Sequence, residues 1–227
     1  MTKQKIQFTD WGILDYQEAW DKQEEIFNLQ LDRKKQKQET EDTVVFVEHP
    51  HVYTLGKSGD AQNMLIAENM LKQIDATYYK VNRGGDITYH GPGQIVGYPI
   101  IDLEHYGIYY KEYIHKLEEA IILYLKEEYN IESHRSDGAT GVWLGEGPTS
   151  RKICAIGTKG SRYITMHGFA LNINTDLKYF NYINPCGFTD KTVTSLEKEI
   201  GKKLDMEEEK EKLLGYILNI FNMEISK

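Results

Sequence analysis

The stretch RGGDITYHGPGQ, residues 83–94, lies between two runs of residues that are typical of β-strands. It holds four glycines in twelve residues, so the backbone either turns sharply, as in a hairpin with tight turns, or lets another group approach closely. The stretch is neither a P-loop, because GxxxxGK[ST] is absent, nor a dinucleotide-binding fingerprint, because no helical pattern follows it. Arg83, Thr88 and His90 favour a ligand site, since polar groups on loops of a rigid scaffold commonly carry binding.

The residues outside this stretch show helical and strand-like patterns in no regular alternation. Apolar residues recur at helical spacing in residues 15–37, 67–75, 109–129 and 206–223. Runs rich in β-branched and aromatic residues predict strands at residues 43–48, 76–82, 95–103, 141–144, 152–158 and 163–173. Because helices do not alternate regularly with strands, we expect an α/β (α+β) fold with a central mixed, largely antiparallel sheet flanked by helices.

Composition places the chain among ordinary globular proteins. Its 227 residues suffice for one well-buried core, and no repeat or linker divides them, so residues 1–227 are expected to form a single domain. The net charge of −8 argues against nucleic-acid binding, and no apolar run approaches the ~20 residues that span a bilayer. Residues 1–10 contain lysines but no apolar segment of a signal peptide, which predicts a cytoplasmic location.

The two cysteines, Cys154 and Cys186, stand in different settings. Without an export signal, two cysteines are more often free thiols in a reducing compartment than a disulfide. Cys154 lies in the apolar run 153–156 and is interpreted as a core residue. Cys186 lies between Pro185 and Gly187, which exclude a helix interior and disfavour a central strand. Its thiol is therefore expected on a turn, where it is either a nucleophile or one more small hydrophobic residue.

A nucleophilic cysteine reacts as its thiolate, a minority species at neutral pH when the pKa is the ordinary ~8.5. A nearby base or cation is then required, and the candidates are Lys152, His90 and His167. Lys152 opens a predicted strand, so it either points into a site at the strand end or is simply solvated there. The histidines show no HExxH or Cys-His spacing, so neither a metal nor another cofactor is expected, and the absence of GxSxG leaves serine hydrolase chemistry unsupported.

Six motifs, found together and in order, resemble the lipoyl (octanoyl) transferase family, a relative of lipoate and biotin protein ligases. The family's glycine signature, RGGxxTYHGPGQ, is complete at residues 83–94. The other five are HPxVYTLG at 49–56, GVW at 141–143, RKICAIG at 151–157, HGFALN at 167–172 and INPCG at 183–187. The resemblance covers about residues 43–187, with no departure at positions that carry the family's chemistry, and leaves out the acidic C-terminal extension.

The resemblance implies a fold like that of biotin and lipoate protein ligases and a catalytic role for the whole domain. Cys186 would be the nucleophile that carries an acyl thioester, and Lys152 would tune the thiol and shuttle protons. The implied substrate-binding residues are Arg83, Gly84, Gly85, Asp86, Ile87, Thr88, Tyr89 and His90 in the loop, with Ala155, Ile156, Gly157, Gly168, Phe169 and Ala170 lining the pocket.

The same resemblance implies the reaction, which is transfer of an octanoyl group from octanoyl-acyl carrier protein to the lysine of a lipoyl domain, the first step of endogenous protein lipoylation. The implied acceptors are lipoyl-domain proteins such as the glycine cleavage carrier protein and the acyltransferase subunits of 2-oxoacid dehydrogenases. Two alternatives remain. An ATP-dependent lipoate or biotin ligase would leave Cys186 idle, and the intact Lys152 and Cys186 speak against a non-catalytic module that binds acyl carrier proteins.

Charge poses a problem for the implied donor. Acyl carrier proteins are strongly acidic, and the chain itself carries −8, so the two repel at long range. Docking then needs a local positive patch, for which Arg151, Lys159 and Arg162 are the candidates because they flank the segment that holds Lys152. The alternative is that they are ordinary solvated residues around a turn at residues 158–161.

Overall fold

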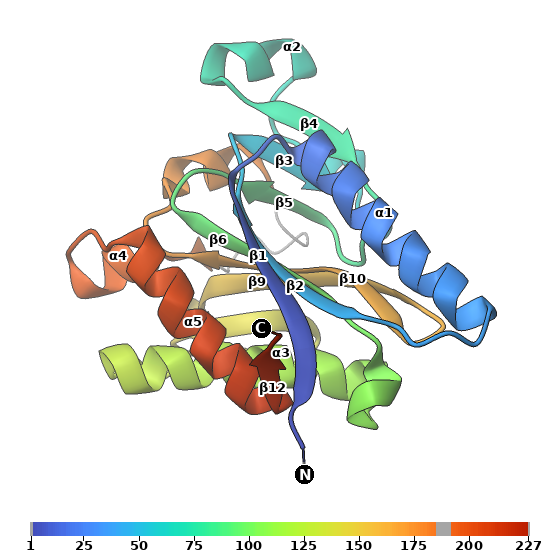
Figure 1. Cartoon of the computed structure of the whole chain (residues 1–227). Coiled ribbons are helices and arrows are strands. Elements are labelled where there is room, and N and C mark those ends of the chain that lie inside the picture. The colour runs from blue at the N-terminus through green and yellow to red at the C-terminus, as the bar shows by residue number, and fades with distance from the viewer. Residues whose placement is uncertain (1, 185–191, 227) are drawn as a thin grey trace.

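The computed structural model describes residues 2–184 and 192–226 (Figure 1). Within this part of the chain, the largest element is a nine-stranded sheet in the order β12-β1-β2-β6-β10-β9-β8-β7, with β11 beside β9. The pairs β12–β1, β1–β2 and β11–β9 are parallel, and the others are antiparallel. The expected mixed, largely antiparallel sheet is therefore confirmed. Its strands are β1 (Gln4–Ile13), β2 (Asp42–Glu48), β6 (Gln94–Ile100), β7 (His134–Ser136), β8 (Ala139–Leu144), β9 (Arg151–Ser161), β10 (Ile164–Asn172), β11 (Thr192–Val193) and β12 (Met223–Ile225).

A second, smaller sheet consists of β4 (Thr77–Lys80), β3 (Val52–Leu55) and β5 (Ile87–His90), in that order. Figure 1 shows it between α2 and the main sheet. β5 lies within the glycine-rich stretch 83–94, but it pairs with β3 and not with β6, which follows it after a turn. The stretch therefore passes from one sheet to the other, and the hairpin alternative is wrong.

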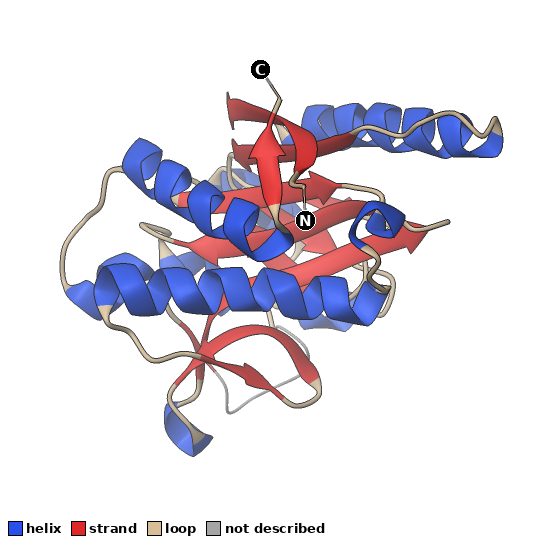
Figure 2. Cartoon of the chain, turned by 60° about the horizontal axis from the view of Figure 1, so that its bottom comes forward, coloured by secondary structure: helices blue, strands red, loops and turns tan. Residues whose placement is uncertain are grey.

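Three long helices cover the main sheet: α1 (Tyr16–Lys35), α3 (Tyr110–Tyr129) and α5 (Met206–Phe221). Helices α3 and α5 lie side by side (Figure 2) and share one core with the inward side chains of β2, β6, β9 and β10. The alternate side chains of β2, β6 and β10 point the other way and pack against α1. The short helices α2 (Glu68–Leu71) and α4 (Leu196–Ile200) lie in connections.

The predicted helices at 15–37, 109–129 and 206–223 are confirmed to within two residues. Asp15 begins α1 because its side chain accepts the N–H groups of the first turn, and Asn130 ends α3 in the left-handed conformation, with φ 53°. The segment 67–75 forms only α2 and a 3₁₀ turn at Lys72–Ile74. The strand predicted at 95–103 stops at Ile100, because Asp102 caps the 3₁₀ helix Leu103–Tyr106.

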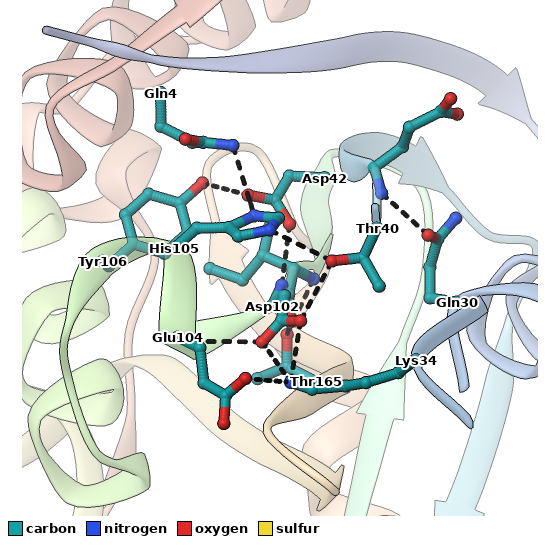
Figure 3. A network of polar contacts seen from close by, with 12 residues as sticks. Gln4, Gln30, Lys34, Thr40, Asp42, Asp102, Glu104, His105, Tyr106 and Thr165 are labelled. Atoms are coloured by element: carbon teal, nitrogen blue, oxygen red, sulfur yellow. Dashed lines mark hydrogen bonds and ion pairs between the residues drawn. The ribbon is translucent and has the colours of Figure 1, made fainter. Parts of the chain in front are cut away.

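A polar network joins the start of β2 to that 3₁₀ helix (Figure 3). The Thr40 hydroxyl donates to buried Asp102 at 2.9 Å, so its oxygen can only accept from His105 Nε2, 3.1 Å away. His105 Nδ1 lies 2.9 Å from Oδ2 of buried Asp42, a carboxylate that only accepts. These two partners favour the imidazolium form of His105, with a hydrogen on each ring nitrogen; the side chain of Gln4 also approaches the ring, with Nε2 3.2 Å from Nδ1.

This network makes stability depend on pH. The hydrogen bond to Asp42 raises the pKa of His105 above 6.5, against the effects of burial and of Lys34. A raised folded pKa means that the stabilisation is fully present below the unfolded pKa and is lost as pH rises through the folded value. His105→Gln should therefore lower the free energy of unfolding, measured by urea titration, more at pH 6 than at pH 9. The exposed His115→Gln is the control; an equal effect of His105→Gln at both pH values would contradict the imidazolium assignment.

Candidate active site

A cavity of about 460 Å³ lies between the main sheet and the small sheet, a size typical of small-ligand sites. Its floor is formed by small residues on adjacent strands. Ala155 and Gly157 of β9 stand opposite Ala170 and Gly168 of β10, so all four point to the same face of the sheet. Small side chains here leave free space above the sheet.

The glycine-rich loop at residues 83–86 lies over this floor and is bonded to it. The Gly84 N–H donates to Thr158 O of β9 at 3.0 Å. A Cβ atom at Gly157 would lie 2.9 Å from Gly84 O, so a larger residue there would push the loop off the strand. The glycines thus allow the close approach of loop and strand that encloses the cavity.

Arg83 brings a buried positive charge to the cavity wall. Its Nη2 donates to Thr54 O at 2.7 Å and to Thr54 Oγ1 at 2.8 Å, and its Nη1 donates to Gly84 O at 2.9 Å. These bonds fix the guanidinium beneath the loop. Its charge also acts on the titration of the histidines described next.

His90 and His167 line the cavity and are neutral near pH 7. Burial lowers the pKa of His90 well below 6.5, and burial lowers that of His167 to about 3; the charge of Arg83 acts in the same direction on both. His90 Nδ1 lies 2.8 Å from Gln94 Oε1, and His167 Nε2 lies 2.8 Å from Asn82 Oδ1. With such low pKa values, neither histidine is suited to take a proton from a thiol near neutral pH.

Lys152, the third candidate base, is the second residue of β9 and also lines the cavity. Its Nζ donates to Thr140 O at 3.1 Å and lies 4.6 Å from the centroid of the Trp143 ring. Its backbone is paired with β11. Val193 stands opposite Lys152, and the Thr194 N–H donates to Lys152 O at 2.9 Å.

Cys186 lies outside the described residues. The described chain stops at Asn184, whose N–H donates to Asn63 O at 2.7 Å, and it resumes at Thr192. Cys154 is fully buried in β9, and burial raises the pKa of its thiol. The interpretation of Cys154 as a core residue is confirmed.

The structure brings most of the expected substrate-binding residues to this one cavity. The lining includes Arg83, Gly84, Gly85, Asp86, Ile87, Thr88, His90, Ala155, Ile156, Gly157, Gly168, Phe169 and Ala170. Tyr89 is placed elsewhere: its ring packs with Tyr53 and Tyr179 in the core of the small sheet. Its hydroxyl lies 2.7 Å from His51 Nδ1.

Three tyrosines line the cavity without a motif that indicates them: Tyr16 from α1, Tyr98 from β6 and Tyr110 from α3. Burial raises the pKa of Tyr16 to about 12 and that of Tyr98 well above 10, so both phenols remain neutral. In the sequence, Tyr16 and Tyr110 belong to the apolar stripes of two helices. Helical spacing alone cannot separate a cavity wall from a core residue.

The three basic residues expected at the site entrance do not form one patch. Arg151 and Lys159 belong to the same long strand, β9, and lie about 26 Å apart at ~3.3 Å per residue. Arg151 is bound to Glu199, with an ion-pair distance of 2.6 Å. Arg162 lies in the turn at residues 162–163, where both residues have positive φ, and not in a turn at 158–161. The prediction of one patch from all three residues is wrong, because an extended strand holds Arg151 and Lys159 far apart.

Among residues 2–184 and 192–226, no group of three or more His, Cys, Asp or Glu side chains is placed to hold a metal ion. Across the same described ranges, no helix has the length and apolar character needed to cross a membrane.

Known proteins similar to this chain agree with the geometry. The family model "Lipoyl protein ligase A/B catalytic domain" matches residues 15–218. An octanoyltransferase from Christiangramia forsetii is 55% identical over 229 residues, which cover 97% of each chain. An octanoyltransferase from Bacteroides fragilis is 56% identical over 207 residues, which cover 90% of this chain and 93% of the relative. This chain belongs to the octanoyltransferase family.

Solved structures extend the likeness of this octanoyltransferase-family chain to ligases. A lipoate-protein ligase A bound with ATP has a TM-score of 0.71 at 11% identity, over 100% of this chain and 88% of that one. A biotin protein ligase from Aquifex aeolicus, in complex with biotin and ATP, has a TM-score of 0.53 at 13% identity, over 95% and 70%. At such low identity these likenesses concern the fold alone, and the expected ligase-like fold is confirmed.

Proposed function

We propose that this protein transfers an octanoyl group from octanoyl-acyl carrier protein to the lysine of a lipoyl domain, through a thioester on Cys186 and with Lys152 as proton carrier. Relatives named octanoyltransferases, more than half identical over nearly the whole chain, support the reaction. The observation that carries the choice of residues is the pairing of β11 with the backbone of Lys152. The chain that returns from Cys186 is therefore hydrogen-bonded beside the candidate base.

The residues on either side of the segment 185–191 support the same choice. Phe180 before it and Val193 after it both line the cavity, as does Lys152. Asn172 also reaches this region, since its Nδ2 donates to Thr194 O at 2.9 Å. A segment whose flanks are fixed at one cavity can present its cysteine there.

In the first half-reaction, the Cys186 thiolate attacks the carbonyl carbon of the donor thioester. The C–S bond to the carrier's thiol then breaks, and that thiol leaves with a proton. Lys152 takes the proton of Cys186 and returns one to the leaving sulfur. The octanoyl chain occupies the space above Ala155, Gly157, Gly168 and Ala170, where the neutral His90 and His167 present no charge to it.

In the second half-reaction, the amine of the acceptor lysine attacks the octanoyl-Cys186 thioester. The acceptor's ammonium group first loses one proton to solvent, which makes its nitrogen nucleophilic. As the C–N bond of the amide forms, Lys152 accepts the second proton from this nitrogen, the C–S bond breaks, and Cys186 leaves as the thiolate. The proposed acceptors are the glycine cleavage carrier protein and the acyltransferase subunits of 2-oxoacid dehydrogenases, and the proposed location is the cytoplasm.

Intact-mass spectrometry tests this function directly. The protein is incubated with octanoyl-acyl carrier protein in the absence of ATP, and then a lipoyl domain is added. We expect an octanoyl adduct on Cys186 that hydroxylamine removes and that the lipoyl domain discharges. Octanoylation of the domain only from free octanoate and ATP, without an adduct on the enzyme, would instead identify a ligase.

A further inference from the structure

Asp86 lines the cavity, and both oxygens of its carboxylate accept hydrogen bonds from the protein. It occupies one of the two positions that the signature RGGxxTYHGPGQ leaves open. Its Oδ1 accepts the N–H of Ile87 at 2.7 Å, and its Oδ2 accepts Asn63 Nδ2 at 2.6 Å. A carboxylate with protein donors on both oxygens offers nothing to an apolar octanoyl group, so a role in binding that group does not explain these contacts.

Asn63 connects Asp86 to the chain that leads to Cys186. It ends the 3₁₀ helix Ala61–Asn63, and residues 63–65 then run antiparallel to residues 182–184. The contacts are a bridge between Met64 and Ile183, a bond from the Leu65 N–H to Tyr182 O at 2.9 Å, and a bond from the Asn184 N–H to Asn63 O at 2.7 Å. Asn63 thus binds Asp86 with its side chain and Asn184 with its backbone.

We propose that Asp86 is a positioning residue for the nucleophile, acting through Asn63 on Asn184, which stands two residues before Cys186. This inference rests on the proposed function and deepens it: the loop at residues 83–86 would help to position Cys186 as well as bind the octanoyl group. A hydrogen bond to a charged acceptor is short and strong, as the 2.6 Å contact is, and it fixes the Asn63 amide in one orientation. The space is tight, since a Cβ atom at Gly59 would lie 2.7 Å from Asp86 Oδ1.

The test is a double-mutant cycle on Asp86 and Asn63, read by the rate of octanoylation of Cys186. Asp86→Ala removes the acceptor of the Asn63 amide, and Asn63→Asp sets two carboxylates against each other. Each should slow acylation at saturating octanoyl-acyl carrier protein by roughly 10- to 100-fold, the scale for a misplaced reacting group. Because donor binding is untouched, the half-saturating donor concentration should change by less than about threefold.

The decisive variant, the reversed pair, exchanges the two side chains. In Asp86→Asn/Asn63→Asp, the amide at position 86 can accept the Ile87 N–H and donate to the carboxylate at position 63, so both hydrogen bonds return. Acylation should recover to within about threefold of the wild-type rate. Asp32→Asn, which removes the same charge from an exposed ion pair with Lys35, is the control and should leave the rate unchanged.

Other outcomes overturn the proposal. If Asp86 instead contacts the donor, Asp86→Ala will raise the half-saturating concentration, and Asn63→Asp will have no effect. Slow acylation of Cys186 in both single variants, without recovery in the reversed pair, also contradicts the proposal. Thermal unfolding of each variant shows whether the fold is intact.

Failure of the proposed function gives a different result, because the wild type then gains no octanoyl group on Cys186. Alkylation of Cys186 by iodoacetamide, followed across pH in a Cys154→Ala background, still tests the positioning. Both single variants should alter the dependence of the alkylation rate on pH, and the reversed pair should restore it. An unaltered pH dependence in both single variants would overturn the proposal.

Discussion

Cys186→Ala is expected to reduce octanoyl transfer by at least about 10³-fold, whereas Cys154→Ala keeps most of the activity. The first substitution removes the only atom that can carry the thioester in the proposed reaction. The second removes a thiol that is fully buried in β9 and whose pKa burial raises, so the thiolate is scarce and cannot reach the donor. Transfer is measured as the mass gain of a lipoyl domain at several enzyme concentrations.

Cys154→Ala serves as the matched control, since both variants lose one thiol. The octanoyl adduct of the wild type should map to the peptide that contains Cys186. An adduct on Cys154, or wild-type transfer by Cys186→Ala, would remove Cys186 from the mechanism.

Lys152→Arg is expected to slow both half-reactions by about 10²-fold or more, the usual scale of general acid–base catalysis. Arginine keeps the positive charge, can donate to Thr140 O and can stack on the Trp143 ring, so these two contacts of Lys152 can be kept. Guanidinium stays protonated, however, and cannot accept a proton from a thiol or an amine. Acylation and discharge of Cys186 are measured separately in single-turnover experiments.

Lys159→Arg is the control, because Lys159 lies on the same strand and also stacks on an aromatic ring, Phe27, at 4.9 Å. It should leave both half-reactions unchanged. Rapid acylation in Lys152→Arg would mean that Lys152 only stabilises the thiolate by its charge. Wild-type rates in both half-reactions would exclude it from the mechanism altogether.

Elements with a strong local pattern could be predicted from the sequence, whereas elements that depend on distant partners could not. The apolar stripes of α3 and α5 and the β-branched run of β2 are sufficient to predict these two helices and this strand. The four residues of β5 are hidden in a glycine-rich stretch, and they form a strand because β3, far back in the sequence, pairs with them. β12 has only three residues and exists because β1 pairs with it.

The candidate site shows the same limit. The residues themselves indicate a glycine-rich polar loop and a lysine at a strand end, whereas the small residues of the floor are expected only from the resemblance to the family. Motifs do not give the direction of each side chain: Tyr89 turns into the small sheet, and Asp86 turns to Asn63. Both directions follow from strand register and neighbours, which a motif does not contain.

The parallel pairing of β1 with β12 bears on how the chain folds. Gln4 stands opposite Met223 and Ile6 opposite Ile225, and the Ser226 N–H donates to Ile6 O at 2.8 Å. β1 therefore cannot gain this neighbour until residues 223–225 have been synthesised. Contacts between residues so far apart in the sequence raise the contact order and slow folding. Until then this edge of β1 stays open, and an exposed strand edge can pair with other chains.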